Sequence, residues 1–126
     1  MNKKRLAIIG ATGSIGRAAL DICRTFPEIF KVMALAVKSN LKGLKKLEEE
    51  FHPELLVVFD KSAASSYIPF YEDVKVLAGQ EGLMQLVQKE LDHIAFASSG
   101  TEAIFALAAA LKKGIEVSLA NKESLI

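Results

Sequence analysis

The fold is decided by a short glycine-rich stretch near the start of the chain, Gly10-Ala11-Thr12-Gly13-Ser14-Ile15-Gly16. An aliphatic run, Arg5 to Ile9, precedes it, and a segment with apolar residues at helical spacing, Ser14 to Phe26, follows it. A strand, a glycine turn and a helix in this order are typical of the opening of a β-α-β unit. The stretch therefore predicts a parallel sheet with a ligand-binding turn after its first strand.

The rest of the chain repeats this alternation of aliphatic runs and amphipathic segments. The expected strands are Arg5 to Ile9, Lys31 to Val37, Leu55 to Phe59, Val74 to Leu77, Ile94 to Ala97 and Glu116 to Leu119. The expected helices are Ser14 to Phe26, Leu41 to Phe51, Ser62 to Tyr67, Gln80 to Lys89 and Thr101 to Lys113. This pattern predicts an α/β fold of the Rossmann type, a doubly wound, mostly parallel sheet with helices on both faces.

Dense charges mark the second expected helix, whose apolar positions are Leu41, Leu44, Leu47 and Phe51. The charged residues are Lys42, Lys45, Lys46, Glu48, Glu49 and Glu50. We expect all of them to form a solvated face, supported by pairs four residues apart.

Composition limits the class of protein. The 126 residues suit one domain, and 51% hydrophobic with 25% charged residues suits a globular core. The net charge of +1 and the absence of a basic, aromatic-rich stretch argue against a nucleic-acid partner. The first aliphatic run ends after four residues at Gly10, and no run approaches the ~20 residues that span a bilayer. We expect a cytoplasmic protein with no membrane partner.

Each glycine of the stretch has an expected role. Gly10 permits the tight turn, Gly13 permits close approach of the backbone to a diphosphate, and Gly16 permits close packing of the helix on the strand. The helix N-terminus offers free N–H groups to anionic oxygens. The alternative is that the glycines make only a structural turn, but their place between a strand and a helix favours dinucleotide binding.

The residues after the second strand indicate which dinucleotide is bound. NAD-binding proteins place Asp or Glu there to accept from the ribose 2′-hydroxyl. This chain has Lys38, Ser39 and Asn40, and an ammonium beside small polar groups suits a 2′-phosphate instead. The sequence thus favours NADP over NAD. The alternative is that Asn40 caps the next helix and Lys38 is an exposed loop residue, and Asn40 can do both.

Two later strand ends fall on the same edge of the expected sheet. Ala97-Ser98-Ser99-Gly100-Thr101 follows the fifth strand, and small residues there let the nicotinamide half lie close to the backbone. Asn121, Lys122 and Glu123 follow the last strand and bring together an amide, an ammonium and a carboxylate. Such a cluster suits a ribose and a phosphorylated or carbonyl substrate. A helix cap with a surface ion pair is the alternative, and spacing leaves both open.

No catalytic or metal-ligating residue is expected within the chain. His52 and His93 lack partners at metal-ligand spacing, so we interpret both as structural or exposed. Cys23, the only cysteine, falls on the first helix, away from the ligand-bearing edge. Tyr67 lacks a Lys four residues later, and Tyr71 has one only where a loop enters a strand.

The stretch at 10–16, taken with Ala120-Asn121-Lys122-Glu123-Ser124-Leu125, resembles the 1-deoxy-D-xylulose 5-phosphate reductoisomerase family. The similarity spans the whole chain. It implies NADPH contacts at Thr12, Gly13, Ser14 and Ile15, at Lys38, Ser39 and Asn40, and at Asn121 and Glu123, with Lys122 facing the substrate. The family often has Gly-Lys-Asn in place of Lys38-Ser39-Asn40, so the 2′-phosphate contact stays open by one residue.

The resemblance also implies an activity. The family rearranges 1-deoxy-D-xylulose 5-phosphate on a divalent metal (Mg, Mn or Co), then reduces the product aldehyde with NADPH to 2-C-methyl-D-erythritol 4-phosphate in non-mevalonate isoprenoid biosynthesis. Its metal-binding carboxylates follow the Asn-Lys-Glu motif. We therefore expect residues 1–126 to be an NADPH-binding domain that is inactive alone, with catalytic and C-terminal domains beyond it and a homodimer at full length.

Two other interpretations compete with this one. A different NADP-linked reductase, such as a semialdehyde dehydrogenase, would need a catalytic Cys or a Tyr-x-x-x-Lys pair. A non-catalytic nucleotide-sensing module would use the same fold without chemistry.

Overall fold

The computed structural model describes residues 2–98 and 101–119. Its centre is a six-stranded sheet in the order β4-β3-β2-β1-β5-β6, and every neighbouring pair runs parallel. The strands are β1 (Lys4–Ile9), β2 (Phe30–Val37), β3 (Leu55–Val58), β4 (Lys75–Ala78), β5 (His93–Phe96) and β6 (Glu116–Leu119). The predicted strands are confirmed, each to within a residue or so at its ends.

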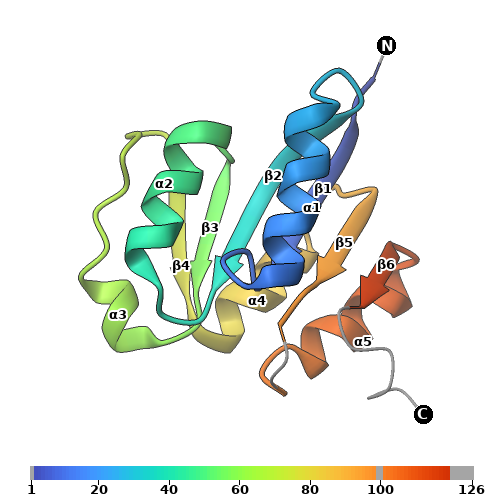
Figure 1. Ribbon diagram of the computed structural model, residues 1–126. Coiled ribbons are helices and arrows are strands. Elements are labelled where there is room, and N and C mark those ends of the chain that lie inside the picture. Colours follow the sequence, from blue (N-terminus) through green and yellow to red (C-terminus); the bar gives the residue numbers. More distant parts are fainter. Residues whose placement is uncertain (1, 99–100, 120–126) are drawn as a thin grey trace.

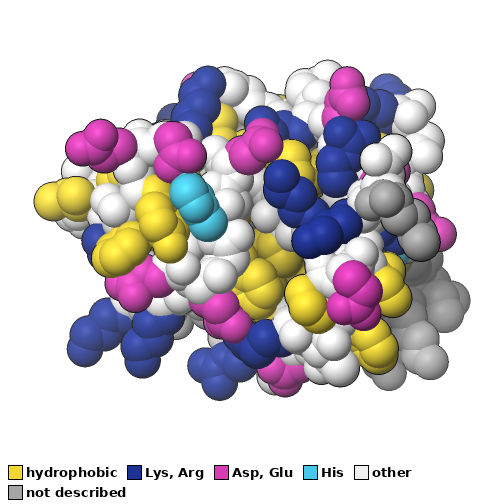
Figure 2. All heavy atoms as spheres, turned by 90° about the horizontal axis from the view of Figure 1, so that it is seen from above, with side chains coloured by type: hydrophobic (Ala, Val, Ile, Leu, Met, Phe, Trp, Pro, Cys, Tyr) yellow, Lys and Arg dark blue, Asp and Glu magenta, His cyan; other side chains and the backbone are white. Residues whose placement is uncertain are grey.

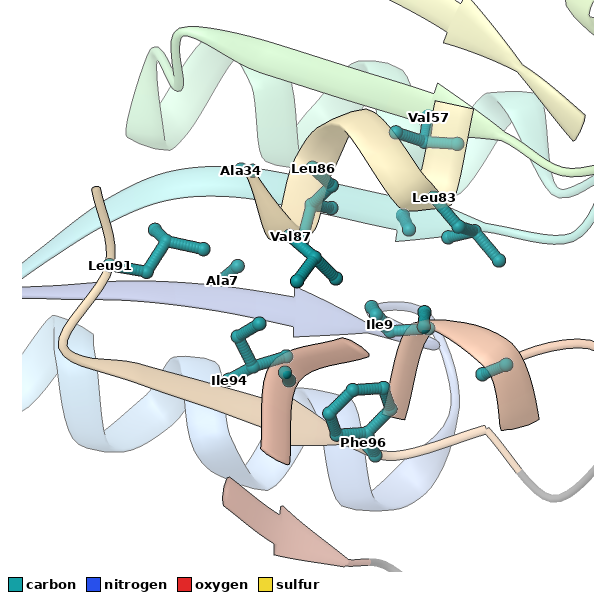
Figure 3. Close-up of a cluster of buried hydrophobic side chains, with 14 of the residues drawn as sticks. Ala7, Ile9, Ala34, Val57, Leu83, Leu86, Val87, Leu91, Ile94 and Phe96 are labelled. Atoms are coloured by element: carbon teal, nitrogen blue, oxygen red, sulfur yellow. The ribbon is translucent and has the colours of Figure 1, made fainter. Parts of the chain in front are cut away.

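Five helices alternate with the strands and cover both faces of the sheet (Figure 1). They are α1 (Ser14–Thr25), α2 (Leu41–Phe51), α3 (Lys61–Ser65), α4 (Gly79–Val87) and α5 (Ile104–Lys113). Side chains of α1, α2 and α3 pack into one core cluster, and those of α4 and α5 pack into the other. Figure 3 shows Leu83, Leu86 and Val87 of α4 between Val57 of β3 and Ala7 and Ile9 of β1. The doubly wound Rossmann-type fold is confirmed.

Burial follows the position of each strand in the sheet. The last four residues of β1, the last six of β2 and all of β3 are buried, because helices cover both of their faces. The outer strands β4 and β6 have no fully buried residue. The long apolar runs of the sequence therefore marked the central strands most clearly.

Strand order reverses beside β1. The chain winds outward from β1 through β2 and β3 to β4, then crosses by way of α4 to β5 on the other side of β1. In open α/β sheets, ligands bind at the carboxyl ends of the strands where the winding reverses. All strands point the same way, so this carboxyl edge carries the loops after β1, β2, β3 and β5.

Two expectations are wrong. The last helix begins at Ile104 and not at Thr101, because residues 101–103 form a turn in which the Ile104 N–H donates to the Thr101 carbonyl. Glu48 is not on a solvated face: its side chain is fully buried. It accepts from the Tyr67 hydroxyl at 2.6 Å and from the N–H groups of Phe70 and Tyr71 at 2.9 Å each. These bonds fasten the segment between α3 and β4 to α2.

Candidate functional site

The glycine turn after β1 is tightly packed against neighbouring backbone at the carboxyl edge. Its start is fixed to β2, since the N–H groups of Gly10 and Ala11 both donate to the Ala36 carbonyl, at 2.8 and 3.0 Å. Gly10 has φ +89°, and a Cβ there would lie 2.6 Å from the Ser98 nitrogen. A Cβ on Gly16 would lie 2.3 Å from the Gly10 oxygen. The turn and packing roles predicted for Gly10 and Gly16 are therefore confirmed.

Gly13 differs from these two glycines. A Cβ on Gly13 would meet only the Gly10 oxygen, at 3.7 Å, which is an ordinary contact, and its backbone is extended (φ −78°, ψ 173°). The fold itself therefore does not require glycine there. Gly13 is also the N-cap of α1, and no described side chain caps this helix end. Ser14 and Ile15 beside it are exposed. The helix thus presents its first N–H groups, with their partial positive charge, without a capping acceptor.

The loop after β2 lies next to the glycine turn. Lys38, Ser39 and Asn40 are all exposed. The Asn40 side chain accepts from the Gly43 N–H at 2.9 Å, so its predicted capping role is confirmed. The α2 end also approaches the turn closely, because a Cβ on Gly43 would lie 2.7 Å from the Thr12 methyl carbon. The two loops that were predicted to bind a dinucleotide are therefore side by side.

The loop after β5 completes the described part of the edge. The Ala97 N–H donates to the Ile9 carbonyl at 2.7 Å, and Ser98 lies against Gly10. Ser98 also donates to Glu102 at 3.4 Å. The predictions for Asn121, Lys122 and Glu123 fall outside the described residues, as do Ser99 and Gly100.

A groove between α1 and α2 opens beside Thr12 and Asn40. Its volume is about 620 Å³, and its lining includes Arg17, Lys42 and Lys46. The sequence alone does not mark these three as site residues, because their grouping depends on how two helices pack. A wider hollow of about 950 Å³ lies at the amino ends of the strands, around Lys4, Pro27 and Asp92. Ligands of open α/β sheets bind at the carboxyl ends of the strands and not at their amino ends, so we assign the ligand site to the carboxyl edge.

The cysteine and the two tyrosines, for which no catalytic role was expected, are buried or hydrogen-bonded within the fold. Burial raises the pKa of the Cys23 thiol, which disfavours a reactive thiolate. Burial and the hydrogen bond to Glu48 raise the pKa of Tyr67, and the Tyr71 hydroxyl donates to the Glu49 carbonyl at 2.8 Å. Cys23, Tyr67 and Tyr71 are therefore held within the fold by burial or by hydrogen bonds.

Both histidines also form hydrogen bonds within the fold. His52 Nε2 lies 2.8 Å from Asp73 Oδ1, with the ring stacked on Tyr71, and His93 lies 2.8 Å from Glu116. Within residues 2–98 and 101–119, no group of three or more His, Cys, Asp or Glu side chains could hold a metal ion. No helix in the same residues is long and apolar enough to cross a membrane.

The all-parallel sheet, its strand order and the glycine turn at the point of reversal define a Rossmann-like α/β protein. Comparison with known families narrows this class. The model of the family described as 1-deoxy-D-xylulose 5-phosphate reductoisomerase matches residues 6–126, and the chain belongs to this family.

Individual relatives agree with this assignment. The 1-deoxy-D-xylulose 5-phosphate reductoisomerase of Thermodesulfovibrio yellowstonii is 39% identical over 98% of this chain. A solved structure of the Zymomonas mobilis reductoisomerase in complex with NADPH superposes on 98% of this chain with a TM-score of 0.83 and 30% identity, over 33% of its own length. A reductoisomerase in complex with NADPH, fosmidomycin and magnesium superposes on 97% of this chain with a TM-score of 0.82 and 34% identity, over 31% of its own length.

This chain spans about a third of the length of the curated relatives it matches: the alignment covers 32% of the Thermodesulfovibrio protein.

Proposed function

We propose that this chain binds NADPH at its carboxyl edge, as the cofactor domain of a 1-deoxy-D-xylulose 5-phosphate reductoisomerase. The observation that carries the proposal is the start of α1, where Gly13 is required by nothing in the fold and no described side chain caps the helix. A helix N-terminus with bare backbone suits a diphosphate by hydrogen bonding and by charge. Relatives with a matching fold were solved in complex with NADPH.

The proposed contacts follow the arrangement of the edge. The backbone of Gly13, Ser14 and Ile15 would hold the diphosphate, and the Thr12 and Ser14 hydroxyls would add donors. Gly10 and Gly16 would keep the turn closed around it. The exposed Lys38, Ser39 and Asn40 would lie at the adenosine end. NADPH supplies a hydride when it is bound, and the role of this chain is to hold and orient the cofactor.

The proposal extends to the residues after the last strand and to the whole enzyme. Asn121 and Glu123 would contact the cofactor and Lys122 the substrate. The full enzyme would act in the cytoplasm as a homodimer, converting 1-deoxy-D-xylulose 5-phosphate to 2-C-methyl-D-erythritol 4-phosphate. The described residues do not fit a divalent metal site, so the metal would be held elsewhere in the enzyme. Residues 1–126 would then form one cofactor domain, without the groups needed for turnover.

Titration of the chain with NADPH and NADH, followed by the enhancement of nicotinamide fluorescence, tests the proposal. We expect saturable binding with a preference for NADPH, and reductoisomerase activity with metal and substrate only in a version extended to the length of the relatives. Gly13→Ala serves as the matched variant, since it preserves the fold but puts a methyl group where the diphosphate would lie. A preference for NADH, equal binding by Gly13→Ala, or activity without metal would contradict the proposal.

A further inference from the structure

The groove between α1 and α2 has two ends of different electrostatic character. At the end near the amino edge, Arg24 forms ion pairs with Asp21 and Glu50, and its Nη2 lies 2.7 Å from a Glu50 oxygen. The hydrogen bond from Arg24 lowers the pKa of the Glu50 carboxyl. Both carboxylates that line the groove are therefore already paired with one arginine.

At the end near the carboxyl edge, the groove is lined by Arg17, Lys42 and Lys46. All three side chains are exposed, and none of them forms an ion pair with the described residues. Arg24 neutralises one of the two carboxylate charges of Asp21 and Glu50, so one negative charge remains in the groove. The other three cations outnumber it. This end of the groove is consequently electropositive, in a protein whose net charge is only +1.

Arg17 is held in place by the glycine turn. Its Nε donates to the Thr12 carbonyl at 3.1 Å, and Thr12 itself touches the start of α2 through Gly43. This bond uses one N–H of the guanidinium and leaves the terminal nitrogens available to an anion. The groove therefore contains an arginine that is hydrogen-bonded to the residue just before the N-cap of α1.

Resting on the proposed function, we infer that this end of the groove binds the 2′-phosphate of NADPH through Arg17 and Lys42, with Lys46 behind them. In Rossmann-type folds the adenosine ribose lies at the end of the second strand, and a nearby arginine accommodates a 2′-phosphate. Thr12 and Asn40, which line the groove, flank that position here. A phosphomonoester is close to dianionic at pH 7, so it matches the excess of cations.

This inference moves the determinant of cofactor choice away from the loop that suggested it. The sequence placed the 2′-phosphate on Lys38, Ser39 and Asn40. The side-chain oxygen of Asn40, however, already accepts from the Gly43 N–H. Lys38 forms no ion pair with the described residues that would orient its side chain. Arg17 is fastened to the turn, and an arginine can bind phosphate with two parallel hydrogen bonds.

The test compares Arg17→Gln and Lys42→Gln with Lys75→Gln, which removes the same charge from an exposed position at the start of β4. Calorimetry measures the binding of NADPH, NADH, adenosine 2′,5′-bisphosphate, adenosine 5′-monophosphate and inorganic phosphate. Losing a charge-assisted contact should weaken NADPH and 2′,5′-bisphosphate binding roughly tenfold for each groove variant. Binding of NADH and 5′-monophosphate should stay unchanged, and Lys75→Gln should resemble the original chain.

The outcomes separate this inference from the proposed function. If the original chain binds NADPH but both groove variants keep its ratio of NADPH to NADH affinity, the groove assignment is wrong while the cofactor domain stands. If inorganic phosphate binds the groove as tightly as the 2′,5′-bisphosphate, the site is a general anion site and the inference is overturned. If the original chain binds neither NADPH nor the bisphosphate, both ideas fail. Arg17 is the groove cation that donates to the turn, so Lys42→Gln tests the groove even if Arg17→Gln disturbs the turn.

Discussion

The two edges of the sheet use their polar groups in opposite ways. At the amino edge, where Figure 2 shows acidic and basic side chains interspersed, charges pair with one another. Lys4 and His93 share Glu116, Arg5 pairs with Glu90 and Asp92, and His52 pairs with Asp73. At the carboxyl edge, no described side chain caps the start of α1, and Arg17, Lys42 and Lys46 form no ion pair with described residues. The pair Lys61–Glu81 is the exception there.

This difference separates stability from ligand binding. Groups satisfied within the protein stabilise the fold, whereas groups left without an internal partner at a strand-end rim are available to a ligand. Substitutions at the amino edge, or of internally bonded groups such as Glu48, should therefore lower the stability of the fold. The molecules that remain folded should bind NADPH normally. Substitutions of carboxyl-edge groups that have no partner within the described residues should do the reverse, and each prediction below tests or refines this rule.

The largest loss of stability is expected for Glu48→Ala in α2. It removes a buried acceptor and leaves the Tyr67 hydroxyl and two N–H groups without it. Since hydrogen bonds to charged groups are the strong ones, the free energy of unfolding should fall by about 3 kcal/mol. Urea denaturation measures this, with exposed Glu49→Ala as a control that should change it by less than ~0.5 kcal/mol. An equal loss in both variants would mean that the Glu48 network adds nothing.

Next in size is the contrast between two glycines of the same turn. Gly16→Ala should destabilise the fold by about 2 kcal/mol, because its methyl group would overlap backbone atoms of Gly10 and Ala11. Gly13→Ala should fold as well as the original chain yet bind NADPH poorly. Parallel denaturation and fluorescence titration would show whether the two effects separate, and a Gly13→Ala protein that unfolds easily would contradict the comparison.

Asn40 both stabilises the fold, as the cap of α2, and lies at the proposed ligand site. Asn40→Ala removes the cap of α2 and should lower the free energy of unfolding by about 1 kcal/mol. Asn40→Asp keeps an acceptor for the Gly43 N–H, so stability should be preserved, but a carboxylate beside a 2′-phosphate should weaken NADPH more than NADH. Thermal unfolding and the two titrations distinguish these roles. Equal weakening of both dinucleotides would argue that the 2′-phosphate lies elsewhere.

The smallest effect is expected on acidification of the amino edge. Hydrogen bonds from His52 and His93 lower the pKa values of Asp73 and Glu116, with a further contribution from Lys4 to Glu116. A lowered pKa in the folded state means that the unfolded state binds protons first, so this stabilisation is complete above about pH 4.5 and is lost as the pH falls through the folded pKa values.

Thermal unfolding between pH 3 and 6 checks the acid effect, and Glu116→Gln should flatten the profile slightly. A steeper decline in Glu116→Gln would contradict the assignment of the lowered pKa to this carboxyl.

The sequence predicted those features that depend on near neighbours. The runs that became β1, β2 and β3 are apolar because both faces of each strand are covered, so they were visible without a structure. Gly16 and Asn40 also act on groups close along the chain, and the positive φ of Gly10 is a local property of the turn.

What it could not predict depends on contacts between distant segments. Helical spacing puts Glu48 on the apolar face of α2, four residues after Leu44 and three before Phe51. Its burial could not be predicted from that position alone, because the groups that donate to its carboxylate lie 19 to 23 residues away. The grouping of Arg17 with Lys42 requires the packing of α1 beside α2. The first turn of α5 was assigned too early because a Thr followed by an apolar run is typical of a helix start, whereas a preceding turn occupies residues 101–103.

The contact of three backbone segments at Gly10, Gly16 and Ser98 has a thermodynamic consequence. Without side chains between them, these segments already touch, so the turn has little freedom to lose when a diphosphate arrives. The entropy of ordering a loop, which weakens many nucleotide sites, would then be absent from the binding free energy. Association would proceed by docking onto a preformed surface, and the affinity would be set by the cations and N–H groups that the diphosphate and its ribose meet there.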